Sequence, residues 1–265
     1  MTQQSPNGTV YELSGPEDAP VIALVHGLGL NRHTWRAHEP VLSTRYRILN
    51  YDLFGHGESA PPPIKPTLSL FAMQLRDLLD FLNIEQCAVV GFSLGGMINR
   101  RFALDYPERA WALGILNSPH ERGDAAQEAV EARAAKSAAG GPGATLDTTL
   151  KRWLTPEFLA NEVEMIANIR QWVLANEPEV YAQCRWVLAN GVIEIIRPKP
   201  PLTLPTLVMT CENDTGSTPA MSHAIASEIP NSQTIIVPHL QHLGLLEQPH
   251  LFTKPVMQFL DGVLA

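Results

Sequence analysis

One stretch, Cys87–Met97, constrains the fold of this chain more than any other. It begins as an apolar run rich in β-branched residues, which predicts a strand buried on both faces. It continues into a helical pattern over Leu94–Tyr106 that Pro107 ends. The turn between them, Gly91–Gly95, has the pattern G-x-S-x-G. Such an abrupt turn predicts strained backbone at Ser93 and lifts its hydroxyl out of the sheet.

Ser93 by itself would be a weak signal, because most serines in such loops only satisfy turns or helix caps. The pattern G-x-S-x-G also occurs by chance. The predicted strand before it and the predicted helix after it supply the context that a nucleophile elbow requires. We therefore expect Ser93 to act as a nucleophile, with the free N–H groups of the helix N-terminus beneath it.

The segments around this stretch alternate between strand-like and helical patterns. The other strands that we expect are Thr9–Leu13, Val21–Val25, Tyr46–Tyr51, Ala112–Leu116, Thr206–Cys211 and Thr234–Val237. The other helices in the alternating part are His33–Leu42, Leu68–Leu82 with Ser69 as its cap, Pro219–Glu228 and Pro249–Val263. This alternation predicts an α/β fold with a mostly parallel, doubly wound sheet.

The alternation stops at His120, where helical patterns follow one another without a strand between them. These patterns are Ala125–Ala139, Leu146–Leu154, Pro156–Arg170 and Pro178–Ala189. Helices inserted into an α/β chain in this way indicate a cap over the sheet. We therefore expect a core made of residues 1–119 and 200–265 and a helical cap made of residues 120–199.

The charge and the cysteine content narrow the classes of partner. A formal net charge of −8 and a pI near 5.6 argue against nucleic acid and anionic membrane surfaces. No apolar run approaches the ~20 residues of a membrane-spanning helix, and Met1–Gly8 lacks the features of a signal peptide. Three cysteines without close spacing suit a reducing cytoplasm and show no metal-binding pattern. We expect a cytoplasmic protein that acts on a small molecule without a metal or organic cofactor, in an oligomeric state that the sequence leaves open.

A serine nucleophile needs a base, and the base needs a carboxylate that holds it in the right tautomer. In an open α/β sheet both come from loops at the carboxyl ends of strands. Asp214 follows the predicted strand Thr206–Cys211, and His242 follows the last predicted strand. The chain order Ser93, Asp214, His242 is the one expected when an elbow serine is the nucleophile.

Two other residues compete for these roles. Glu212 directly follows its strand, which places it too close to the strand end to reach a separate loop. His239 comes almost directly after the last strand, whereas His242 opens a glycine-containing loop that can fold back toward Ser93. We therefore expect Asp214 and His242 to be the acid and the base.

An oxyanion that forms during acyl transfer needs two backbone N–H donors. The N–H of Leu94, just after the nucleophile, is one candidate. The loop after the strand Val21–Val25 should supply the other, and Leu28 is our choice. We interpret His26, in the same loop, as a buried structural histidine and not as a second base.

These pieces together resemble the α/β-hydrolase superfamily over the whole chain. The segments that carry the resemblance are His26–Gly29, Asp52–Ser59, Gly91–Gly96, Asn213–Asp214 and His242–Pro249. Within the superfamily the chain is most similar to 3-oxoadipate enol-lactonases and related esterases, through the cap segments Arg152–Phe158 and Tyr181–Cys184. It departs from them at His26-Gly27, where those lactonases tend to carry Asn-Ser, and at Cys211, where the family often places glycine.

We expect the pocket under the cap to be mainly apolar and to take a small acyl group, with a carboxylate of the substrate at its far end. The apolar candidates for its lining are Trp153, Phe158, Met165, Ile166, Trp172 and Trp186. The cations that could pair with a carboxylate are Arg133, Arg152, Arg170 and Arg185. The alternative is that the apolar residues form the core of the cap and that the arginines are solvated or pair with its glutamates. From these we select Trp153, Trp186 and Arg133 as substrate-binding residues.

The resemblance and the predicted triad together imply a serine hydrolase that cleaves a carboxylic ester or lactone. A cofactor-free C–C bond hydrolase would use the same triad. A ligand receptor on this fold, which keeps the triad but turns over slowly, is the alternative from another class. Turnover of p-nitrophenyl esters separates the enzyme from the receptor.

Overall fold

The computed structural model describes residues 1–265, and its centre is an eight-stranded sheet with the order β1-β2-β4-β3-β5-β6-β7-β8. The strands are β1 (Gln3–Gln4), β2 (Val10–Ser14), β3 (Val21–Val25), β4 (Arg47–Tyr51), β5 (Cys87–Phe92), β6 (Ala110–Leu116), β7 (Thr206–Cys211) and β8 (Ser232–Val237). The pairs β1–β2 and β2–β4 are antiparallel, and every other pair is parallel. The predicted α/β fold with a mostly parallel sheet is confirmed.

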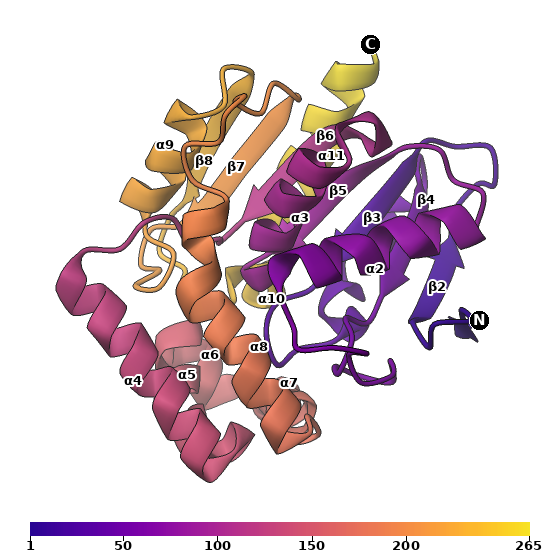
Figure 1. Cartoon of the computed structure of the whole chain (residues 1–265). Helices are drawn as coiled ribbons and strands as arrows, with labels where there is room; N and C mark the ends of the chain where they lie inside the picture. Colours follow the sequence, from indigo (N-terminus) through magenta and orange to yellow (C-terminus); the bar gives the residue numbers. More distant parts are fainter.

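The helices that follow the strands cover both faces of this sheet (Figure 1). They are α1 (Glu39–Leu42), α2 (Leu68–Phe81), α3 (Leu94–Asp105), α9 (Pro219–Ser227), α10 (Gly244–Glu247) and α11 (His250–Leu264). Helices α2 and α3 pack together on the near face in Figure 1, and α11 lies behind the sheet. Every residue of β3 and β5 is buried, as their continuous apolar sequences predict for central strands.

The register of the parallel strands brings several strand ends into line. Phe92 at the end of β5 lies opposite Leu116 at the end of β6, and Leu116 lies opposite Met209 in β7. The backbone N–H of Asn117 continues this ladder by donating to the carbonyl of Met209 over 2.7 Å. The residues that follow β5, β6 and β7 therefore meet at one edge of the sheet.

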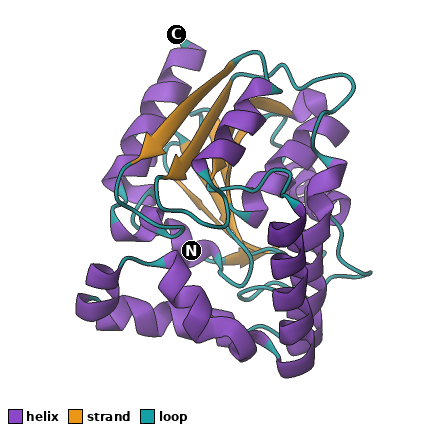
Figure 2. Cartoon of the chain, turned by 90° about the vertical axis from the view of Figure 1, so that its left-hand side faces the viewer, coloured by secondary structure: helices purple, strands orange, loops and turns teal.

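Five α-helices lie in sequence between β6 and β7 and gather at one end of the sheet (Figures 1 and 2). They are α4 (Asp124–Gly140), α5 (Leu146–Trp153), α6 (Pro156–Asn161), α7 (Val163–Leu174) and α8 (Pro178–Asn190). Buried side chains of α5, α7 and α8, such as Leu150, Ile169 and Cys184, belong to the same hydrophobic core as the sheet. We call these helices the cap helices, and they are packed onto the rest of the molecule through apolar contacts.

Some local predictions were wrong. Thr67, and not Ser69, caps α2, because its side-chain oxygen accepts the N–H of Leu70 over 3.0 Å. The single helix expected over Pro156–Arg170 is two helices, since Glu162 leaves the helical conformation with φ −103° and ψ 57°. The helix expected over 33–42 is a short 3-10 turn over Arg32–Trp35 followed by α1.

No helix of the structure combines the length and the apolar character needed to cross a membrane.

Candidate active site

The turn between β5 and α3 holds Ser93 in a strained conformation, with φ 56° and ψ −112°. Positive φ is uncommon for a residue with a side chain, so the surrounding structure must hold it there. The Ser93 N–H donates to the carbonyl of Leu116 over 2.8 Å, which ties the turn to β6. A Cβ atom at Gly91 would lie 2.1 Å from the carbonyl oxygen of Gly95, so only glycine allows this crossing. The backbone strain predicted from the sequence is present.

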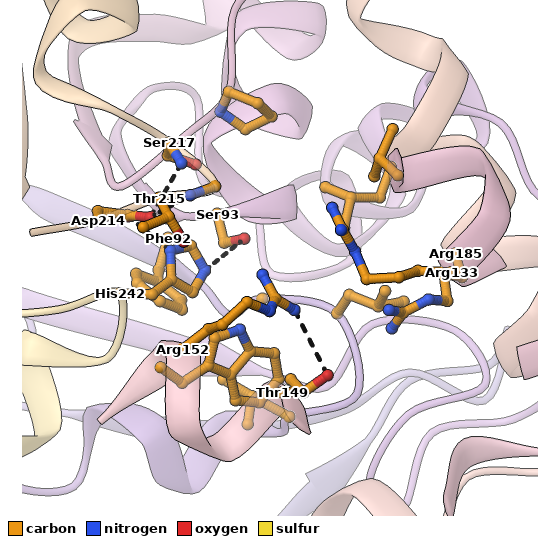
Figure 3. Close-up of a pocket in the computed structure, with 18 of the residues that line it drawn as sticks. Phe92, Ser93, Arg133, Thr149, Arg152, Arg185, Asp214, Thr215, Ser217 and His242 are labelled. Carbon is orange, nitrogen blue, oxygen red and sulfur yellow. Dashed lines mark hydrogen bonds and ion pairs between the residues drawn. The ribbon is translucent and has the colours of Figure 1, made fainter. Parts of the chain in front are cut away.

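Ser93 is the first member of a hydrogen-bonded chain of three side chains (Figure 3). Its Oγ lies 3.1 Å from Nε2 of His242, and Nδ1 of His242 lies 2.6 Å from Oδ2 of Asp214. When Nδ1–H donates to the carboxylate, the lone pair of Nε2 faces the serine hydroxyl. All three residues are buried. The structure thus brings together the three residues that were predicted from their positions after strands. They have the geometry of a nucleophile, a base and an orienting acid.

The carboxylate of Asp214 is held by donors on both of its oxygens. Oδ1 accepts the backbone N–H groups of Gly216 and Ser217 over 2.8 and 2.9 Å. Oδ2 accepts the amide of Asn117 over 2.9 Å in addition to the imidazole of His242. Burial would raise the pKa of Asp214, but the imidazole and the hydrogen bonds outweigh burial and keep it below the usual value. Asp214 is therefore ionised at neutral pH and can orient His242.

Asn117 is a site residue that the sequence reasoning missed. It directly follows β6, which lies between the strand that leads to Ser93 and the strand that leads to Asp214. Its positive φ of 45° turns the chain at the strand end, and its Nδ2 also lies 3.3 Å from Oγ1 of Thr210. Its place after a central strand, beside two other polar strand ends, is the signal that could have found it.

The two rival residues lie away from Ser93. Glu212 accepts the backbone N–H of His239 over 2.9 Å, and Nδ1 of His239 lies 3.7 Å from the same carboxylate oxygen. The side chain of His239 is 90% exposed and that of Glu212 is 52% exposed. Since neither contacts the buried chain of Ser93, His242 and Asp214, the structure does not bring the rivals into the site.

Two backbone N–H groups near Ser93 are free to bind an anion. Leu94 is the first residue of α3, and Leu28 lies in the loop after β3 and lines the same cavity as Ser93. Neither N–H donates a hydrogen bond to another group of the protein. A Cβ atom at Gly27 would lie 3.2 Å from Cβ of Ser93, so the backbone of the Leu28 loop runs close beside the nucleophile. Both candidate oxyanion donors are therefore available at the elbow.

His26 holds the loop after β3 in place through two hydrogen bonds, as expected for a structural histidine. Its Nδ1 donates to the carbonyl of Gly27 over 2.8 Å, and its Nε2 accepts the N–H of Leu53 over 3.0 Å. Burial is the main cause that lowers the pKa of His26 to about 4. The imidazole is therefore neutral at pH 7, and both of its nitrogens are already occupied.

The cavity above Ser93 is lined by apolar residues together with several charged ones. Only six of its nineteen lining residues are hydrophobic. Trp153 lines it and lies close to the imidazole of His242, with 6.0 Å between the ring centroids. The other apolar residues of the cap that were candidates for the lining pack against the hydrophobic core: Phe158, Met165, Ile166 and Trp172. The lining is therefore mostly polar or glycine by number of residues, whereas the larger share of its surface is apolar, so the expectation of a mainly apolar pocket is not contradicted.

Trp186 is not part of this cavity, contrary to our expectation. It is 49% exposed and lies in a groove between α4 and α8 on the outer surface. Adjacent residues of a helix point about 100° apart, so Arg185, its neighbour on α8, lines the cavity while Trp186 points away. Arg133 lines the cavity as predicted, whereas Arg170 pairs with Asp147 over 2.6 Å near the surface.

No cluster of three or more histidine, cysteine, aspartate or glutamate side chains is arranged to hold a metal ion. The titratable groups that line the cavity are arginines, together with Asp214 and His242. The arrangement therefore offers acid–base and nucleophilic chemistry at Ser93, beside a concentration of positive charge.

Comparison with known proteins gives consistent matches over nearly the whole chain. Residues 22–254 match the model of the alpha/beta hydrolase family. The chain is 28% identical over 247 residues to 3-oxoadipate enol-lactonase 2 of Acinetobacter baylyi, which covers 93% of this chain and 90% of that protein. It is 25% identical to the (E)-2-((N-methylformamido)methylene)succinate hydrolase of the same organism, over 98% of this chain and 97% of that protein. The crystal structure of the enol-lactonase from Burkholderia xenovorans LB400 is similar with a TM-score of 0.88 and 28% identity, covering 96% of this chain and 98% of that chain.

Proposed function

Because the chain belongs to the alpha/beta hydrolase family, we propose that it is a serine hydrolase that cleaves a carboxylic ester or lactone. The observation that carries the proposal is the buried chain of hydrogen bonds from Ser93 through His242 to Asp214. The names of the relatives support it, since one is an enol-lactonase and another is a hydrolase of a succinate derivative. These names belong to proteins of no more than 28% identity, so they support the class of reaction more strongly than any one substrate.

In the first half of the proposed reaction, Oγ of Ser93 attacks the substrate carbonyl while Nε2 of His242 takes the hydroxyl proton. The carbonyl oxygen becomes an oxyanion that the N–H groups of Leu28 and Leu94 stabilise. Asp214 stabilises the imidazolium that forms, because its carboxylate accepts Nδ1–H over 2.6 Å. His242 then gives its proton to the leaving alcohol oxygen, which leaves an acyl group on Ser93.

In the second half, water attacks the acyl group and His242 takes the proton of the water. The tetrahedral intermediate collapses, His242 returns the proton to Oγ of Ser93, and the carboxylic acid leaves. The proton balance closes with the side chains of the site and water alone.

We place the protein in the cytoplasm, because its three cysteines are unpaired and buried, as suits a reducing compartment.

The test of this proposal is the hydrolysis of p-nitrophenyl acetate and butyrate by the wild type and by Ser93→Ala. Because alanine fits the turn, the variant should stay folded and lose roughly 10⁴–10⁶ in kcat. Ser227→Ala, which changes an exposed serine on α9, is the matched control and should keep wild-type activity. A folded Ser93→Ala variant that retains most of its activity would remove Ser93 from the mechanism. Cleavage of a 2-hydroxy-6-oxo dienoate, with no ester hydrolysis, would favour the C–C hydrolase instead.

A further inference from the structure

Four arginines line the cavity that contains Ser93: Arg122, Arg133, Arg152 and Arg185. Arg122 precedes α4, and the other three lie on the cap helices α4, α5 and α8. Figure 3 shows the side chains of Arg133, Arg152 and Arg185 directed into the space beside Ser93, with Arg152 nearest to His242. Segments far apart in the sequence thus bring four guanidinium groups to one cavity.

None of these four arginines forms an ion pair with an acidic residue of the protein. Arg185 is only 6% exposed, and the single hydrogen bond of its guanidinium goes to the phenol oxygen of Tyr181 over 3.0 Å. Arg152 has one long contact of 3.4 Å with Oγ1 of Thr149. Many of the hydrogen-bond donors of the cluster therefore have no partner in the protein.

The partners of Arg122 are neutral. Its guanidinium donates to the carbonyls of Leu188 and Ala189 over 3.4 and 3.2 Å. The surface arginine Arg170 shows the contrast, because it pairs with the carboxylate of Asp147. The lack of acidic partners is thus a property of the arginines in the cavity and not of every arginine in the cap.

Without a bound anion, the positive charges of the four arginines repel one another across the cavity. Burial and the neighbouring arginines lower the pKa of Arg152 to about 10, and burial and Arg133 lower that of Arg122 to about 10. These groups still carry their charge at pH 7. The only carboxylate that lines the cavity is Asp214, which is already engaged by His242. Arg185 is buried and the other three are half-buried, so water screens their repulsion only in part, and opposite charge in the cavity would stabilise them.

We propose that the physiological substrate is an ester or lactone that carries at least two carboxylate groups, which these arginines bind. A single carboxylate accepts the bidentate fork of one guanidinium, or one bond from each of two, and would leave two or three of the four arginines without an anionic partner. Two or more carboxylates match the four cations better. This inference rests on the proposed hydrolysis at Ser93 and adds the charge of the molecule that is hydrolysed.

The positions of the arginines suggest how such a substrate lies. Arg152 is close to the triad, since Figure 3 shows it beside Ser93 and His242 and the charge of Asp214 acts on its pKa. Arg133 and Arg185 lie together on the other side of the cavity (Figure 3). One carboxylate would therefore bind Arg152 near the reacting carbonyl, and another would bind Arg133 and Arg185 farther away.

The first test compares three lactones that share one ring and differ in charge. They are γ-butyrolactone, its γ-carboxylate and its β,γ-dicarboxylate, with hydrolysis followed by base uptake in a pH-stat. Because a hydrogen bond to a charged group changes binding by about 10- to 100-fold, each added carboxylate should raise kcat/KM by roughly tenfold or more. A neutral lactone that reacts as fast as the dicarboxylate would overturn the inference and leave a general esterase.

The second test measures binding without catalysis. Calorimetry with Ser93→Ala should show that tricarballylate, a tricarboxylate, binds at least tenfold more tightly than butyrate, and that Arg133→Gln and Arg152→Gln each reduce this preference about tenfold. Arg170→Gln is the control, because Arg170 is paired at the surface outside the cavity. Equal binding of the two acids, or a preference unchanged in both cavity variants, would refute the anion site. If no ester or lactone is hydrolysed, the proposed reaction fails, and this binding result still decides the anion site.

Discussion

Lowering the pH from 7 to 5 should remove a large part of the stability of this protein, because three histidines are buried in their neutral form. Burial is the main cause that lowers the pKa of His26 and His38 to about 4 and that of His56 to about 3. In the unfolded chain a histidine titrates near pH 6.5. Since the folded pKa values are depressed, the contribution of these groups is fully present above about pH 6.5 and is lost as the pH falls toward 4.

The size of the effect follows from this difference in proton binding. Between pH 7 and 5 each of the three histidines takes up a proton almost only in the unfolded chain. This lowers the free energy of unfolding by about 2 kcal/mol per group. Together they should lower the free energy of unfolding by about 5–6 kcal/mol. A domain is usually stable by only 5–15 kcal/mol, so partial unfolding near pH 5 is the expected outcome.

Urea unfolding at pH 7, 6 and 5, followed by tryptophan fluorescence, measures this loss. His56→Gln should shrink the loss between pH 7 and 5 by about one third, whatever it does to stability at pH 7, because one titrating group is gone. His56 suits this substitution, since its Nδ1 donates to the carbonyl of Phe54 and its Nε2 has no partner. His223→Gln, at an exposed position on α9, should keep the wild-type pH dependence. A change of less than about 1 kcal/mol in the wild type, or an unchanged loss in His56→Gln, would refute the reasoning.

Three further predictions concern the site. Asp214→Asn should lower kcat by about 10⁴ through the wrong imidazole tautomer, while Glu212→Gln stays active, and the reverse result would exchange their roles. His242→Ala should be inactive and His239→Ala active in the p-nitrophenyl butyrate assay, and an inactive, folded His239→Ala would contradict the assignment. Asn117→Ala removes a donor to the carboxylate of Asp214 and should lower kcat about tenfold, measured beside near-ultraviolet circular dichroism to show that the fold is kept.

The sequence alone determined the class of fold and the three residues at the centre of the site. Continuous apolar runs define buried parallel strands, and the carboxyl ends of such strands must meet at one edge of the sheet. The loops that carry Ser93, Asp214 and His242 could therefore be placed together from their positions after the strands. The strain at Ser93 also follows from local sequence, because the glycines around it permit a crossing that any side chain would block.

Only the tertiary structure decided what lines the cavity. A helical pattern shows which residues share a face but not what that face meets, so Trp186 looked as suitable as Trp153 and points outward. For the same reason the surface pair of Arg170 could not be told from the unpaired guanidinium of Arg185. The bond from Asn117 to Asp214 joins residues 97 positions apart in the chain. Such contacts depend on how the cap helices and the strands pack against one another, which spacing along one segment does not specify.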